Sequence, residues 1–224
     1  MKKGGMQLSA GVSLYFSGAF GRRELARDGY ANMLTRVTRD PLRTVEDFIR
    51  VLTIIPSFLE AQDGFTYYWF HADKRPEWEA ECEGAVLAYR HEEPQSVVCS
   101  EPERWKEIKA CLEGRCLTLA ALFVGNSLPG FSSLVNGAVF KVRRTRIVIE
   151  LWLSRVPTAD ERKMLGGVLG ACLGEDLAPS SLTLTSMDDL IRSSRSSRQS
   201  SRATSEDTRR RGSRSGSRLR RGGD

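Results

Sequence analysis

The sequence has little of what most enzymes need. Among its 224 residues there are only two histidines, His71 and His91, which leaves a zinc site or a His-based catalytic triad short of parts. The phosphate-cradling, dinucleotide-binding, metalloprotease and nucleophile-elbow motifs (GxxxxGK[ST], GxGxxG after a strand, HExxH, GxSxG) are all missing. We therefore expect a protein that is not an enzyme, with no catalytic residue, no metal and no cofactor.

Long apolar runs and paired cysteines are missing as well. No stretch of 18 or more apolar residues occurs, which excludes a membrane-spanning helix, and the N-terminus lacks the apolar segment of a secretory signal. The five cysteines are an odd number without a CxxC pair, which is typical of reduced thiols inside the cell. We expect a cytoplasmic protein without a membrane partner, and its presence in the nucleus stays open.

The net charge of +6 hides two regions of opposite character. Residues 192–224 contain eleven arginines, ten serines and three acidic residues, with almost nothing apolar. Such a segment cannot bury enough surface to fold, so we expect one domain at residues 1–191 and a disordered Arg/Ser-rich tail at 192–224. The domain holds the remaining 23 basic and 25 acidic side chains. The tail either only improves solubility or binds RNA phosphates in a way that serine phosphorylation would weaken.

The hydrophobic pattern of the domain predicts strands interleaved with three helices. Short β-branched or aromatic runs indicate strands at residues 12–16, 30–38, 65–71, 84–90, 137–143, 146–153 and 182–185. Capping boxes predict helices that begin at residues 44–47, 100–103 and 158–161 and end near residue 55, at Gly114 and near Leu173. The apolar run at 116–124 fits either a buried helix or a strand. Short hairpins favour antiparallel pairing, so we expect an α+β fold with one antiparallel sheet and helices on one face.

The segment Arg75-Pro76-Glu77-Trp78-Glu79 is the most informative one. Pro76 stiffens this loop, so that Trp78 can be held away from the core. An indole in such a position can stack on a base, which is worth about 1–3 kcal/mol. A base with a positive charge adds a cation–π term of about 0.5–2 kcal/mol. Glu79 offers a carboxylate that can accept two N–H bonds from the edge of guanine. The alternative is a tryptophan packed on the sheet edge beside a solvated glutamate.

A second cluster surrounds the predicted hairpin. Four cations fall within six residues, and a tryptophan follows farther along: Lys141, Arg143, Arg144, Arg146 and Trp152. In a domain that is otherwise mildly acidic, such cations are suited to hold phosphates. The alternative is a charged β-turn that prevents aggregation between sheet edges.

Four segments together resemble a known family. They are Thr44-Val-Glu-Asp-Phe48; Tyr67-x-x-Phe70 with Pro76-Glu-Trp-Glu79; Trp105-x-Glu107-x-x-x-Cys111-Leu112-x-Gly114; and Gly137-Ala-Val-x-x-Val-Arg143 through Trp152. In this order and spacing, residues 8–186 resemble eukaryotic translation initiation factor 4E, a family that binds the 7-methylguanosine cap of mRNA. The resemblance implies a monomer with a cupped antiparallel sheet, three helices on its convex face, and capped mRNA as a partner in translation initiation and its regulation.

The resemblance also implies roles for individual residues in base recognition. Trp78 takes the place of one of two rings that sandwich the methylated base, and Glu79 takes the place of the group that recognises guanine. The second ring is tryptophan in most of the family, and Tyr30 is the nearest aromatic residue here. Trp152 falls at the position that contacts the methyl group.

The phosphates would be held by the hairpin. Arg143 falls at the position of the family's first phosphate-binding residue, and Arg144 and Arg146 are further candidates for phosphate binding. The turn after Arg143 is short compared with the family, so that one phosphate ligand is either lost or shifted.

The helical face of the family binds scaffold and repressor proteins. The corresponding positions here are Val45, Ile49, Trp105, Lys106, Glu107 and Ala110. Ile49 replaces a tryptophan, and Lys106 and Ala110 replace apolar residues, so the usual scaffold motif is expected to bind poorly. The expected partner is a scaffold of the initiation factor 4G type or a repressor, and whether its binding motif differs from the usual one stays open. About eleven additional residues near 115–134 either recruit a different partner or fill in a loop.

Two other functions stay open. One is an adaptor or translational repressor of the same fold that does not bind the cap and contacts RNA through its Arg/Ser tail. The other is a nucleotide hydrolase that uses the acidic loop at residues 77–83, although no metal-binding or phosphate-cradling motif accompanies this loop.

Overall fold

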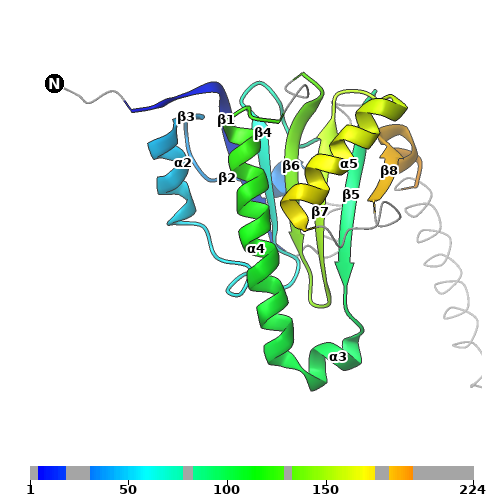
Figure 1. Ribbon diagram of the computed structural model, residues 1–224. Coiled ribbons are helices and arrows are strands. Elements are labelled where there is room, and N and C mark those ends of the chain that lie inside the picture. The colour runs from blue at the N-terminus through cyan, green and yellow to red at the C-terminus, as the bar shows by residue number, and fades with distance from the viewer. Residues whose placement is uncertain (1–4, 19–30, 78–82, 129–132, 175–181, 194–224) are drawn as a thin grey trace, which may run out of the picture.

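The strands form one curved antiparallel sheet (Figure 1). The computed structural model of the chain describes residues 5–18, 31–77, 83–128, 133–174 and 182–193. Within them the strands are β1 (Gln7–Ser17), β2 (Thr35–Arg36), β3 (Leu42–Thr44), β4 (Thr66–His71), β5 (Ala85–Glu92), β6 (Val135–Val142), β7 (Arg146–Leu153) and β8 (Leu182–Ser186). The helices are α2 (Val45–Leu52), α3 (Gln95–Ser100), α4 (Pro102–Val124) and α5 (Ala159–Leu173), with a 3₁₀ turn at Ala31–Met33.

All strand pairs are antiparallel. The order across the sheet is β2-β1-β4-β6-β7-β5-β8, and β3 pairs with β1 beside this path. The predicted α+β class is therefore confirmed, as are the strands predicted at 12–16, 65–71, 84–90, 137–143, 146–153 and 182–185, with differences of at most five residues at each end.

The two faces of the sheet carry separate apolar clusters, because successive side chains of a strand point to opposite sides. On the helical face, residues such as Leu14, Trp69 and Ile149 belong to the main core, together with buried residues of α2, α4 and α5. Figure 1 shows α4 and α5 lying across this face. The opposite side, the open face, carries a smaller cluster, whose buried members are Tyr68, Phe70, Val86, Val139, Trp152 and Met187.

Two of the three predicted capping boxes begin helices. Thr44 Oγ1 accepts a hydrogen bond from the N–H of Asp47 at 3.1 Å and caps α2. Thr158 and Glu161 form the complete reciprocal box at the start of α5. The hydrogen-bonded guanidinium of Arg155 and the backbone N–H of Thr158 lower the pKa of Glu161 to about 2. Local sequence thus decides where both helices begin.

The third helix start, predicted at residues 100–103, is confirmed, since α4 begins at Pro102, but the capping box predicted there is wrong. Ser100 is the last residue of α3, and its hydroxyl donates to the carbonyl of Val97 at 3.4 Å. Glu101 precedes α4 without a side-chain capping bond, and Pro102 occupies the first turn, where its missing N–H costs least. Because α3 ends directly where α4 begins, Ser100 lies inside a helix and cannot cap the next one.

The helix end predicted at Gly114 is also wrong, because α4 continues to Val124. Gly114 itself is exposed. After it, α4 buries an apolar stripe at helical spacing: Cys116, Leu119, Ala120, Phe123 and Val124. Burial of these side chains outweighs the roughly 1 kcal/mol that a glycine costs inside a helix. The run at 116–124 is therefore a buried helix, and it accounts for much of the additional segment near 115–134.

The strand predicted at residues 30–38 is largely wrong. Only the two residues of β2 pair with β1, opposite Tyr15 and Phe16. The same edge of β1 is then taken by β3, which pairs opposite Gln7 and Val12. Two short strands share one edge, and the chain between them must turn, so a long strand cannot form there.

The C-terminal boundary stays a prediction. Residues 187–193 are helical and follow β8 directly, so the predicted boundary after residue 191 falls within this helical segment. Residues 194–224, which make up nearly all of the predicted tail, lie outside the described residues.

Two glycines provide a test of the packing of α4 and β6. A Cβ added at Gly114 would meet no atom within 4 Å, so Gly114→Ala should stabilise the protein by about 0.5–1 kcal/mol. A Cβ added at Gly137 would lie 2.6 Å from the ring of Phe70, so Gly137→Ala should destabilise it by about 1–3 kcal/mol. Urea unfolding of both variants measures the difference. A destabilised Gly114→Ala variant would contradict an uninterrupted α4.

Candidate nucleic-acid interface

Three of the predicted base-binding residues, Tyr30, Trp78 and Glu79, lie outside the described residues. The structure does describe the chain that leads to Trp78. Pro76 is buried, and Arg75 Nε pairs with Glu77 Oε1 at 3.0 Å. The beginning of this loop is therefore ordered by the burial of Pro76 and by an ion pair within the loop.

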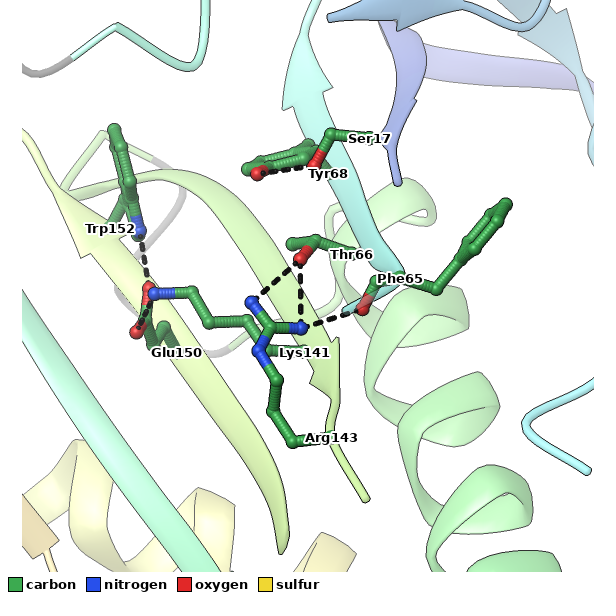
Figure 2. A network of polar contacts seen from close by, with 8 residues as sticks. All are labelled: Ser17, Phe65, Thr66, Tyr68, Lys141, Arg143, Glu150 and Trp152. Atoms are coloured by element: carbon green, nitrogen blue, oxygen red, sulfur yellow. Dashed lines mark hydrogen bonds and ion pairs between the residues drawn. The ribbon is translucent and has the colours of Figure 1, made fainter. Parts of the chain in front are cut away.

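The open face carries a buried carboxylate between the middle strands. Glu150 of β7 is only 8% exposed and uses both of its oxygens. One oxygen forms an ion pair with Lys141 of β6, and the other accepts the indole N–H of Trp152 at 3.0 Å (Figure 2). A buried charge is tolerated when it is paired and hydrogen-bonded, and both conditions are met here.

Trp152 is part of the floor of the open face. Trp152 is only 1% exposed. Its ring packs edge to face on the ring of Phe70, with centroids 5.4 Å apart and an interplanar angle of 82°. The bond to Glu150 fixes the orientation of the indole. The predicted contact of Trp152 with a methyl group stays a prediction.

Arg143 lies just beyond β6 and is held by neutral oxygens. Its guanidinium donates to the carbonyl of Phe65 at 3.0 Å and to Thr66 Oγ1 at 3.2 Å (Figure 2). It also donates to the carbonyl of Val142 at 2.8 Å. Burial, assisted by the nearby charge of Arg146, lowers the pKa of Arg143, but an arginine still stays protonated at neutral pH. The group is oriented, and no carboxylate of the described residues forms an ion pair with it.

The other two predicted phosphate ligands differ from Arg143 in their environment. Arg144 is exposed, and its backbone N–H donates to Asp63 Oδ1 at 2.8 Å. Arg146 is half-buried at the start of β7 and faces the same side of the sheet as Glu150. The structure therefore brings Arg143 and Arg146 to one end of the open face.

Sequence reasoning missed three polar residues of this face. Thr66 orients Arg143, Tyr68 hydrogen-bonds to Ser17 at 3.1 Å, and Glu150 pairs with Lys141. A signal for Glu150 was present, because it is the only acid inside the apolar strand Ile147–Leu153 and a buried acid needs a partner. Thr66 and Tyr68 carry no such signal, since both are ordinary strand residues.

The predicted partner surface on the helical face is partly apolar. Ile49 is 55% exposed on α2, whereas Trp105 of α4 is 6% exposed and stacks on His91 with centroids 6.1 Å apart. Lys106 is exposed and paired with Glu103 at 2.7 Å. The remaining predicted positions are Val45, which is half-buried, and Glu107 and Ala110, which are exposed.

Two further features are absent from the described part of the chain. It contains no group of three or more His, Cys, Asp or Glu side chains that could hold a metal ion. None of its helices is long and apolar enough to cross a membrane.

The family comparison gives a clear result. The model of the family described as eukaryotic initiation factor 4E matches residues 8–202. A comparison with curated proteins finds no match.

Several solved structures have a similar fold. C. elegans eIF4E-3 in complex with the 4E-binding protein Mextli has a TM-score of 0.66 at 22% identity, over 82% of this chain and 94% of that chain. Ascaris suum eIF4E-3 in complex with m2,2,7G cap has a TM-score of 0.64 at 20% identity, over 82% and 92%. Schistosome eIF4E complexed with m7GpppA and 4E-BP has a TM-score of 0.59 at 22% identity, over 75% and 82%. At these identities, the comparison shows a shared fold.

The Glu150–Lys141 pair can be tested through stability. Glu150→Leu leaves Lys141 unpaired beside an apolar strand and should cost about 1–3 kcal/mol, a range reduced because Lys141 remains 24% exposed. The double variant Lys141→Met/Glu150→Leu should recover at least half of this loss, because no unpaired charge remains. Urea unfolding measures both.

A matched control is the exposed pair Lys106–Glu103 on α4. Its disruption by Glu103→Leu should change the free energy of unfolding by less than about 1 kcal/mol. If Glu150→Leu had an equally small effect, the carboxylate would not organise the open face.

Proposed function

The chain belongs to the eukaryotic initiation factor 4E family, and we propose that it binds the 7-methylguanosine cap of mRNA in translation initiation, by recognition and without catalysis. The observation that carries this proposal is Arg143, a cation oriented by neutral oxygens whose charge is left for a phosphate. Relatives solved with m2,2,7G cap and with m7GpppA share the fold and support the proposal.

The proposed base site consists of Trp78, Tyr30 and Glu79. Methylation at N7 gives guanine a formal positive charge, so that an aromatic face gains about 0.5–2 kcal/mol of cation–π attraction in addition to stacking. Glu79 accepts the two N–H groups of the guanine edge, and a charged acceptor makes such bonds strong. Trp152 is the proposed methyl contact. Because it is 1% exposed, the groups that cover its indole must move when the cap binds.

The proposed phosphate site consists of Arg143 with Arg144 and Arg146. Arginine suits this role, because its planar guanidinium presents paired donors to phosphate oxygens. Lys141 is less suited, since its ammonium group is already paired with Glu150. The phosphate grip is therefore assigned to the arginines at the end of the hairpin.

We also propose a protein partner on the helical face, at Val45, Ile49, Trp105, Lys106, Glu107 and Ala110. The relatives bound to Mextli and to 4E-BP support a scaffold or repressor as the partner. Ile49 offers an exposed apolar contact, and Lys106 offers a charge where an apolar groove is expected. A helix that fits here would place an acidic residue opposite Lys106.

One observation favours the alternative function of an adaptor or repressor that does not bind the cap. Trp152 is covered, and Lys141 is neutralised by Glu150, so part of the open face is closed to a ligand. In that case the Arg/Ser tail supplies the contact with RNA. Retention on a cap-analogue resin after removal of residues 194–224 distinguishes the two functions, because only a protein with a cap pocket is retained.

The central prediction concerns the charge of the base. In a fluorescence titration of the tryptophans, 7-methyl-GTP should bind at least about tenfold more tightly than GTP, because only the methylated base gains the cation–π term. Trp78→Ala should remove this preference, and Glu79→Ala should lower the affinity for both nucleotides together. Glu103→Ala, which removes the same charge from an exposed position of α4, serves as the control. Equal affinities for the two nucleotides would refute the mechanism.

A second prediction separates phosphate binding from base binding. Arg143→Ala should weaken the binding of 7-methyl-GTP by about 1.5–3 kcal/mol, the value of a hydrogen bond to a charged group. The affinity for 7-methylguanosine, which has no phosphate, should fall much less. Isothermal titration with both ligands measures this split, and Arg162→Ala on α5 is the matched control. A parallel loss for both ligands would show that Arg143 only supports the fold.

A further inference from the structure

One more cation lies on the open face beside the hairpin. Arg90 of β5 pairs across the sheet with Val148 of β7, and Val148 pairs with Lys141 of β6. These three residues form one row, and strands lie about 4.8 Å apart, so Arg90 and Lys141 stand about 10 Å from each other. Because residues of one row project from the same face, Arg90 and Lys141 lie on the same side of the sheet, with the short side chain of Val148 between them.

Arg90 is exposed, and no hydrogen bond or ion pair of its side chain is found in the described part of the chain. Its exposed guanidinium is therefore available to a ligand. The neighbouring row begins at Arg143, continues to Arg146 and ends at Glu92, which pairs opposite Arg146.

The charges at this end of the face do not cancel. Five cations meet three carboxylates here: Lys141, Arg143, Arg144, Arg146 and Arg90 are opposed by Glu150, Glu92 and Asp63. Glu150 is already paired with Lys141. Two rows of side chains on three strands thus leave an excess of positive charge that extends from the hairpin to β5.

The other end of the open face is apolar. Met187 is fully buried in the apolar cluster with Trp152 and Val86, and its N–H bonds to the carbonyl of Gly84 at 3.0 Å. Gly84 and Arg90 are six residues apart along the strand, or about 20 Å. A polyanion that crosses this face is therefore directed away from Met187 and toward Arg90.

We propose that Arg90 extends the phosphate site of the open face to β5 and binds a phosphodiester of the RNA chain that follows the cap. This inference rests on the proposed function, because the cap would place the first nucleotides on this face. Arg90 adds an electrostatic contact that is independent of base identity, as contacts with a nucleic-acid backbone are. A protein with this contact distinguishes a capped chain from a free cap nucleotide.

The test compares two ligands in the full chain: 7-methyl-GTP and a capped oligonucleotide of five nucleotides. Arg90→Ala should lower the ratio of the oligonucleotide affinity to the nucleotide affinity by about two- to fivefold, as expected for the loss of one solvent-exposed charged contact. The salt dependence of oligonucleotide binding should fall by about 0.7 in slope, the value for one phosphate on a single strand. Arg90→Lys, which keeps the charge, should retain most of the ratio.

Arg104→Ala is the matched control, because it removes the same charge from α4 on the helical side. Its ratio should equal that of the wild type. If Arg90→Ala also kept the wild-type ratio, the inference would be overturned, and any preference for the oligonucleotide would belong to the tail. If the wild type failed to bind 7-methyl-GTP at all, the proposed function would fail instead, so the two failures are distinguishable.

Discussion

The alternation of side chains along the strands governs how both faces of the sheet are built. Because a strand sends successive residues to opposite faces, one set of apolar residues packs on the helices while the other set is left on the open face. The same rule brings Lys141, Glu150 and Trp152 together from two strands. A shift of one residue of β7 against β6 would turn Glu150 and Trp152 under the helices and separate Glu150 from Lys141. The register of one hairpin therefore determines both the core and the candidate site.

The open face combines two demands that usually conflict. A flat aromatic ring needs an apolar floor, and a triphosphate needs cations, yet unpaired cations are costly beside apolar residues. The sheet separates them along its strands, with Trp152, Phe70 and Met187 at one end and Arg143 and Arg146 at the other. Glu150 lies between the two ends and satisfies both sides, since it binds the indole N–H and the ammonium of Lys141.

Much of the fold could be predicted from the sequence, because strong local signals and tertiary packing agree in most of it. The capping groups Thr44 and Thr158 start helices as expected, and six of the seven predicted strands form. The failures occur where packing overrides a local signal. Gly114 does not end α4, because the residues after it bury a continuous apolar stripe. The strand expected at 30–38 shortens to β2, because β2 and β3 share one edge of β1.

The candidate site was predictable only in part, for a different reason. Cations near a turn can be recognised in a sequence, but which of them is already neutralised depends on the partner across the sheet. Arg143 and Lys141 look alike in the sequence, and only the pairing of β6 with β7 gives Lys141 its carboxylate. Arg90 was missed, because nothing within β5 distinguishes it from a solvated strand residue.

The charge of the domain illustrates why arrangement matters more than totals. The predicted domain at residues 1–191 carries slightly more acidic than basic side chains, and from net charge alone it should repel RNA. At physiological salt, however, a charge is felt over about 8 Å, so a phosphate on the open face responds mainly to the few side chains around it. Those near the hairpin are predominantly cationic, while acidic residues such as Glu103 lie on α4, beyond the sheet. An acidic domain can therefore hold a phosphate chain on one face, and the strongly basic tail is not required to explain binding there.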